Sequence, residues 1–201
     1  MDRIELEIKV LQDEPVVFIV GGVHGAGKSS FCANLLNLNP IPFVTPEEIK
    51  KSLTVDYTQQ EIYRRIHKQV YDYLESGQSF IFEHVMSGHY VERLISKAVM
   101  FNFNVHLVYI DIESADLACS RVRQRVNQGG HHRERDVIEK RLGESRENFY
   151  NNYKNKASSW SLYCNSDIEH RCVATARHSS GVRVYIQSRY KKFIALCNGK
   201  S

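Results

Sequence analysis

Eight consecutive residues near the N-terminus have the composition and spacing of a phosphate-binding loop. Residues 22–29 read Gly-Val-His-Gly-Ala-Gly-Lys-Ser and match G-x-x-x-x-G-K-[ST]. The glycines allow backbone N–H groups to face bound phosphates, and the N-terminus of a following helix adds partial positive charge. Lys28 would reach the β- and γ-phosphates, and the Ser29 hydroxyl would bind Mg²⁺. We expect ATP and Mg²⁺ as cofactors, with ATP bound by Gly22, His24, Gly25, Ala26, Gly27, Lys28, Ser29 and Ser30.

Two acidic residues stand at the ends of apolar runs, and either would suit a nucleotide site. Glu83 follows Phe80-Ile81-Phe82, and Asp111 follows Leu107-Val108-Tyr109-Ile110, which has the form of a Walker B strand. The arginine-rich segment follows the strand that ends at Asp111. In small P-loop kinases, the acid that faces the nucleotide ends the strand before that one. We therefore place Glu83 in the site and predict a loop or capping role for Asp111.

Seven arginines are concentrated in a lid region over residues 121–146, at positions 121, 123, 125, 133, 135, 141 and 146. Arg121 and Arg125 are four residues apart and share a helix face, whereas Arg123 points elsewhere. Guanidinium groups aimed at a transferring phosphoryl group stabilise the charge of the transition state. We expect Arg125 to bind the nucleotide. The alternative is a solvated helix whose arginines pair with Glu134, Asp136 and Glu139.

Apolar patterning predicts strands that alternate with helices around these residues. Strands are expected over residues 16–20, 41–44, 79–83, 105–112, 171–176 and 182–186. Helices are expected over residues 28–36, from an N-cap at Thr45, from a Thr58–Glu61 capping box to Gly77, and over 90–100, 114–130, 135–156 and 189–197. This order predicts a single domain over residues 1–201, an α/β three-layer sandwich with a mainly parallel sheet, in which the motif would be the P-loop. A glycine-rich turn without phosphate binding is disfavoured, because the motif lies between a strand and a helix.

Composition restricts the class of protein further. The net charge of +4 is too small to indicate a nucleic-acid partner, and the arginines lack interleaved aromatic residues for base stacking. The five cysteines are scattered, with no spacing typical of a metal site, and indicate reduced thiols in the cytoplasm. No signal segment or membrane-spanning run is present, so we expect no membrane association and no structural metal.

The chain also resembles the zeta toxin family of P-loop kinases over roughly residues 16–166. The similarity rests on Gly-Ala-Gly-Lys-Ser, on residues 46–49 and 82–83, and on residues 87–88. It rests above all on residues 121–131, which read R-V-R-Q-R-V-N-Q-G-G-H, and it continues through residues 137–148 and 162–166. The P-loop is shared by many families, whereas the arginine-rich segment is far more specific.

The resemblance implies an ATP-dependent kinase that phosphorylates a hydroxyl of a nucleotide sugar, UDP-N-acetylglucosamine in studied members, and that often pairs with an antitoxin. It implies that Lys28, Arg121 and Arg141 act on the transferring phosphate. It further implies that Glu83 and His131 contact the acceptor. Glu47 stands where the family usually has the Asp that serves as the base. Both residues also have an explanation without a functional role. A carboxylate such as Glu47 is favoured in the first turn of a helix by the helix dipole, and His131 could cap the C-terminus of a helix.

Several positions depart from the family pattern on the acceptor side. Arg133-Glu134 replaces Val-Pro, Glu144 stands where Arg is common, and His84-Val85 replaces small hydroxyl residues. His24 stands in the P-loop where Asn is common, and we interpret it as a wall residue. These departures keep open the alternative of a nucleotide or small-molecule salvage kinase. Glu in place of Asp at position 47 keeps open a nucleotide-dependent switch module with little transfer. A polynucleotide 5′-hydroxyl kinase is disfavoured by the missing aromatic residues.

Overall fold

Strand β1 (Val16–Gly21) lies in the middle of the sheet, and all six of its residues are buried. It pairs in parallel with β3 (Phe80–His84) and β4 (Asn104–Asp111). The computed structural model describes residues 14–38, 40–51, 58–127, 133–166, 169–178 and 180–199. A run of β-branched and aromatic residues that is buried on both faces is typical of a central parallel strand, as the sequence predicted.

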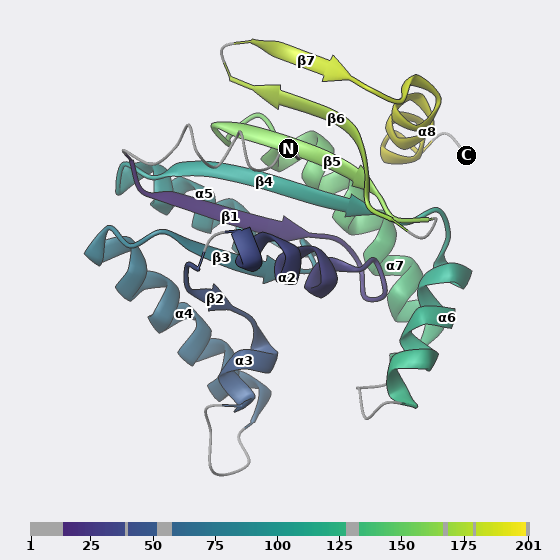
Figure 1. Cartoon of the computed structure of the whole chain (residues 1–201). Helices are drawn as coiled ribbons and strands as arrows, with labels where there is room; N and C mark the ends of the chain where they lie inside the picture. The colour runs from purple at the N-terminus through teal and green to yellow at the C-terminus, as the bar shows by residue number, and fades with distance from the viewer. Residues whose placement is uncertain are drawn as a thin grey trace.

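Within the described ranges, seven strands form one sheet in the order β2-β3-β1-β4-β5-β6-β7 (Figure 1). The outer strands are β2 (Phe43–Val44), β5 (Ser159–Cys164), β6 (Arg171–Arg177) and β7 (Gly181–Val184). The five strands from β2 to β5 are parallel, while β6 and β7 are antiparallel. The prediction of a mainly parallel sheet is confirmed.

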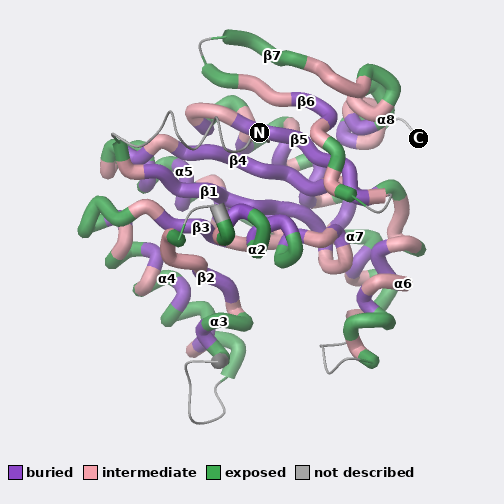
Figure 2. The backbone as a smooth tube through the Cα atoms, in the orientation of Figure 1, coloured by how far each residue is buried: buried purple, intermediate pink, exposed green. Residues whose placement is uncertain are grey.

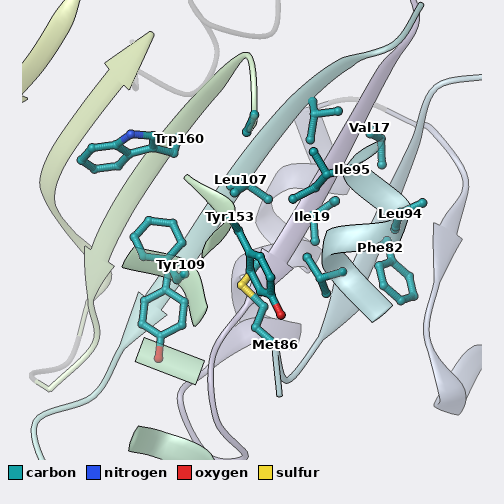
Figure 3. Close-up of a cluster of buried hydrophobic side chains, with 14 of the residues drawn as sticks. Val17, Ile19, Phe82, Met86, Leu94, Ile95, Leu107, Tyr109, Tyr153 and Trp160 are labelled. Atoms are coloured by element: carbon teal, nitrogen blue, oxygen red, sulfur yellow. The ribbon is translucent and has the colours of Figure 1, made fainter. Parts of the chain in front are cut away.

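Helices cover both faces of this sheet and bury two separate cores (Figure 2). Their bounds are α2 (Lys28–Leu38), α3 (Pro46–Lys51), α4 (Gln59–Ser76), α5 (Tyr90–Met100), α6 (Ala115–Val126), α7 (Arg135–Glu147) and α8 (Gln187–Cys197). One core packs α4, α5 and α8 against the sheet, and it includes Ile19, Phe82 and Tyr109 (Figure 3). The other core packs α2 and α6 against alternate strand residues such as Phe18 and Val108. Two cores on opposite faces make the three-layer sandwich that the sequence predicted.

The helix starts predicted from capping residues are present. The Thr58 hydroxyl accepts from the Glu61 N–H, and the Glu61 carboxylate accepts from the Thr58 N–H, which completes the capping box of α4. Thr45 accepts from the Glu48 N–H at 3.0 Å. Ser114 caps α6 by accepting from the Leu117 N–H at 3.2 Å.

Two elements differ from the sequence prediction. Strand β5 was missed because its serines interrupt the apolar pattern, although Ser159 and Ser161 both bond the ring of His106, which satisfies their hydroxyls inside the sheet. The helix predicted over 135–156 ends at Glu147 and continues as a π-helical turn, η1 (Asn148–Tyr153). That wider turn buries Phe149 and Tyr153, while Asn148 Nδ2 donates to the Met86 carbonyl at 3.0 Å.

None of the helices in the described part of the chain is long and apolar enough to cross a membrane. All five cysteines are free.

Asp111 is neither a loop nor a capping residue, which corrects the sequence prediction. It ends β4 and accepts from Arg146 Nε at 2.8 Å, while Arg146 Nη2 donates to the Ile112 carbonyl at 2.6 Å. The two side chains are only 14% and 8% exposed. The carboxylate therefore neutralises a buried guanidinium between β4 and α7.

Removal of the Asp111 carboxylate should strongly destabilise the fold. Asp111→Ala leaves Arg146 buried without its counter-charge, and we expect the free energy of unfolding to fall by about 3–5 kcal/mol. The measurement is urea unfolding followed by circular dichroism. Asp72→Ala breaks the exposed Lys68–Asp72 pair and serves as the control, with an expected change below about 0.5 kcal/mol. Equal losses from the two substitutions would contradict this account of Asp111.

Candidate functional site

The P-loop lies between β1 and α2, at the edge of the sheet where the parallel strands end. Gly25 and Gly27 have φ angles of +82° and +94°, which favour glycine. A Cβ at Gly25 would come within 2.5 Å of the Ala118 carbonyl oxygen, and one at Gly27 would overlap Asn165 Nδ2. Both glycines are therefore required by close contacts as well as by backbone conformation.

Two side chains that follow β5 support the loop from outside. Asn165 Nδ2 donates to the Ala26 carbonyl at 2.8 Å, and His170 Nε2 lies 3.1 Å from the Gly27 carbonyl. Arg121 Nη1 donates to the Asn165 carbonyl at 2.6 Å, which ties α6 to the same segment. The carbonyls of Ala26 and Gly27 are thereby held, and the Ala26 N–H donates to the Val23 carbonyl at 3.1 Å, which fixes the backbone of the loop.

Sequence reasoning gave no role to Asn165 or His170. Asn165 belonged to a stretch that carried the family resemblance, and that was the one signal the sequence offered. His170 lies outside that stretch. Both contacts depend on β5 lying beside β4, and β5 was missed, so their proximity to the P-loop was not foreseeable.

Glu83 is the acid that contacts the P-loop. Ser29 Oγ donates to Glu83 Oε2 at 3.0 Å, and Lys28 Nζ lies 3.6 Å from Glu83 Oε1. Lys28 is buried, with 6% of its surface exposed, and it also donates to the Val23 carbonyl at 3.2 Å. Asp111, the other candidate, is engaged with Arg146. The Glu83 carboxylate therefore counters the buried lysine and orients the serine hydroxyl.

These oxygen atoms suit a magnesium ion that is shared with phosphate. Mg²⁺ prefers oxygen ligands and usually combines one or two protein groups with phosphate oxygens and waters. Ser29 Oγ and Glu83 supply such groups beside Lys28. Among the residues that the structure describes, no cluster of three or more His, Cys, Asp and Glu side chains forms a separate metal site.

His24 joins the P-loop to α7. Its Nε2 lies 3.0 Å from Arg141 Nη1. Burial is the main cause that lowers the pKa of His24 to about 3, and the positive charges of Lys28, Arg133, Arg141 and Arg125 act in the same direction. The imidazole is therefore neutral at physiological pH, and cations from the P-loop, from α6 and from the region of α7 surround it.

The arginine cluster divides into groups with different surroundings. Arg121, Arg125, Arg133 and Arg141 lie near the P-loop, as their contacts and their effect on His24 show. Arg135 pairs with Asp116 of α6 at the surface. Arg146 is buried against Asp111, and Arg123 is exposed on α6. Part of the predicted lid is thus core structure.

Two further residues predicted for the site are exposed. Glu47, the predicted base, lies in the first turn of α3, and Ser30, predicted to bind ATP, lies in the first turn of α2. His84, next to Glu83, accepts from the Met86 N–H at 2.8 Å. Burial lowers the pKa of His84 to about 4, with Lys28 and Arg141 contributing in the same direction. His131, His132 and the Gly129-Gly130 end predicted for α6 lie outside the described residues.

Comparison with known proteins supports the fold. A family model described as an AAA domain matches residues 17–151. No curated protein matches the sequence. The solved complex of AvrRxo1-ORF1 and -ORF2 with ATP is 18% identical, with a TM-score of 0.68 over 94% of this chain and 67% of that chain.

Two further structures are similar to this chain at low identity. The PezAT toxin–antitoxin system of Streptococcus pneumoniae is 11% identical, with a TM-score of 0.62 over all (100%) of this chain and 98% of that chain. The Pnkp1/Rnl/Hen1 RNA repair complex is 17% identical, with a TM-score of 0.56 over 66% of this chain and 44% of that chain. Such identities show a shared fold.

Substitution at Gly27 should damage the P-loop, whereas substitution at Gly143 should not. A methyl group at Gly27 overlaps Asn165 Nδ2, so Gly27→Ala must move the loop or its support. We expect ATP affinity to fall at least about 10-fold, the equivalent of one misplaced charge-assisted hydrogen bond. The measurement is isothermal titration calorimetry with MgATP.

Gly143→Ala is the matched control. Gly143 lies in α7, and an added methyl group there would have nothing within 4 Å, so alanine should raise stability by up to about 1 kcal/mol through helix propensity and leave ATP affinity unchanged. Unchanged affinity in Gly27→Ala would contradict the assignment of the loop.

Proposed function

We propose that this chain, which belongs to the AAA domain family, is an ATP-dependent kinase that transfers the γ-phosphoryl group to a hydroxyl of a small acceptor. The observation that carries this proposal is the contact of Lys28, Ser29 and Glu83 at the P-loop, with Arg141 reaching the same loop from α7. A phosphate cradle, a metal-binding hydroxyl and a long cationic side chain from another element are the parts that phosphoryl transfer requires.

Each part has a proposed role in the reaction. Backbone N–H groups of the P-loop and the Lys28 ammonium bind the β- and γ-phosphates, and bound Mg²⁺, held by Ser29, would offset their charge. Arg121, Arg125 and Arg141 stabilise the charge that develops on the transferring group. Glu83, which contacts Lys28 and Ser29, would face the metal or the acceptor.

Glu47 is the proposed base. It lies exposed in the first turn of α3, directly after β2, at the sheet edge that carries the P-loop. Phosphoryl transfer depends mainly on positioning and charge stabilisation, so Glu47 would orient the acceptor hydroxyl and accept its proton late.

The proposed acceptor is a nucleotide sugar such as UDP-N-acetylglucosamine, with His131 among its contacts. Support comes from the resemblance to zeta toxins and from the structural likeness to PezAT.

An antitoxin is proposed as a partner, because PezAT is a toxin–antitoxin system and AvrRxo1-ORF1 is solved with a second chain. The five free thiols suit a reducing cytoplasm, where ATP is present. We propose that residues 1–201 work as one domain.

A nucleotide-dependent switch is the second candidate function. The observation that favours it is the exposure of Glu47 to solvent in a helix of only six residues, an environment that does little to fix the direction of a catalytic carboxylate. Such a protein would bind ATP and transfer nothing. A salvage kinase on the same fold differs from the first proposal in its acceptor, so the identity of the phosphorylated product separates the two.

Wild-type protein should add one phosphate to a nucleotide sugar when ATP and Mg²⁺ are present. Mass spectrometry of the acceptor after incubation with UDP-N-acetylglucosamine, other nucleotide sugars, nucleosides, NAD and oligonucleotides identifies the product. Lys28→Ala should lower turnover by at least about 100-fold, because its charge stabilises the transition state. Phosphate gain on nucleosides alone would support the salvage kinase. ATP binding without transfer to any acceptor would support the switch.

Replacement of the proposed base should slow transfer without weakening nucleotide binding. Glu47→Gln keeps the size of the side chain and removes the proton acceptor, and we expect kcat to fall about 10²–10⁴-fold with ATP affinity within about 2-fold of wild type. Steady-state kinetics and calorimetry check both values. Glu48→Gln is the matched control, since Glu48 lies beside it in the same helical turn and its N–H is used by Thr45. A normal rate in Glu47→Gln would remove this residue from the base role.

A further inference from the structure

We propose that His24 is a positioning residue, which holds the Arg141 guanidinium against the P-loop before the nucleotide arrives. The inference rests on the proposed function, because Arg141 is assigned there to the transferring phosphate. It assigns a specific role to a side chain that the sequence analysis placed among the ATP-binding residues, as a wall of the loop.

The hydrogen bond itself fixes the chemistry of the histidine. Arg141 Nη1 and His24 Nε2 are 3.0 Å apart and come from segments 117 residues apart in sequence. A guanidinium has donors and no acceptor, so Nε2 must be the acceptor. The imidazole must therefore be neutral and carry its proton on Nδ1.

The surroundings keep His24 in this neutral form. The groups that face it are cationic: Lys28 of the P-loop, Arg125 of α6, and Arg133 and Arg141 from the α7 segment. Together with burial, these charges place its pKa at about 3. At physiological pH, the neutral ring thus accepts a hydrogen bond from the Arg141 guanidinium. A protonated ring would repel that guanidinium.

A positioned arginine offers a specific advantage at this place. The arginine side chain has many rotamers, and an arginine that must find the phosphate loses that conformational freedom on binding. A bond to the loop that also binds the phosphates removes part of this loss in advance. Because His24 belongs to the P-loop, its bond holds the Arg141 guanidinium close to the loop that binds the phosphates.

A double-mutant cycle separates this role from simple packing. His24→Leu removes the acceptor, His24→Gln keeps an acceptor oxygen near the position of Nε2, and Arg141→Gln removes the guanidinium. Affinities for MgATP and MgADP are measured by calorimetry for each variant and for His24→Leu/Arg141→Gln. We expect His24→Leu to weaken ATP binding about 5–10-fold and ADP binding less than about 2-fold, since Arg141 acts on the terminal phosphate.

Coupling is the decisive readout of the cycle. In the Arg141→Gln background, His24→Leu should change ATP affinity less than about 2-fold, because its effect acts through the missing guanidinium. His24→Gln should restore most of the affinity lost in His24→Leu. Arg123→Gln, which replaces an exposed arginine on α6, is the matched control and should leave both affinities unchanged. Additive effects, or an equal loss of ATP and ADP affinity in His24→Leu, would overturn the proposal.

A measurement without nucleotide distinguishes failure of this inference from failure of the proposed function. The ¹⁵N NMR chemical shifts of the His24 ring should report a neutral ring protonated on Nδ1 at pH values above and below the ordinary histidine pKa. The chemical shift of Nε2 should change in Arg141→Gln and stay unchanged in Arg123→Gln. A ring that titrates as an ordinary histidine does, or an Nε2 shift insensitive to Arg141→Gln, would sink the proposal even if the protein is a kinase. A protein that binds ATP without transfer would refute the kinase and leave the pairing of His24 with Arg141 intact.

Discussion

Positive charge held close together around one loop is the constraint on which this structure depends. Lys28, Arg125, Arg133 and Arg141 all act on His24, and Glu83 is the acid in contact with the buried Lys28. Like charges at short range repel one another, and burial of Lys28 increases the cost of its charge. Such an arrangement persists where a rigid frame fixes its parts, and it favours a ligand that carries several negative charges. A nucleoside triphosphate is a ligand of this kind.

The frame is the C-terminal edge of the parallel sheet. The P-loop follows β1, Glu83 lies near the end of β3, and Asn165 follows β5, so three strands of the sheet contribute to the site at one edge. Asn165 and His170 hold the loop carbonyls, and the buried Asp111–Arg146 pair fixes β4 to α7, the helix that carries Arg141. Ligand sites at this edge are typical of open α/β sheets. The position of Arg141 relative to the loop is thus determined by the core as well as by its bond to His24.

Local signals in the sequence predicted the P-loop side of this arrangement well. The glycines, Lys28, the capping residues of α4 and α6, and the buried central strands follow from short patterns with direct physical causes. The contacts that fix the loop from outside do not, because they join residues more than 100 positions apart and depend on strand order. Strand β5 shows the difference. Its serines interrupt the apolar pattern of the sequence, and the sheet accommodates them because the His106 ring forms hydrogen bonds with Ser159 and Ser161. Arg146 and Asp111 likewise resembled site residues, and it was burial against each other that separated them from the site.

The fate of the terminal phosphate of ATP tests the central claim most directly. Protein incubated with Mg²⁺, ATP labelled on the γ-phosphate and a bacterial small-molecule extract is examined for the chemical form of the label, with Lys28→Ala run in parallel. The account predicts label in a phosphate ester of a small hydroxyl compound, formed by the wild-type protein and absent with Lys28→Ala. Label that remains in ATP, or that appears only as inorganic phosphate, would contradict it.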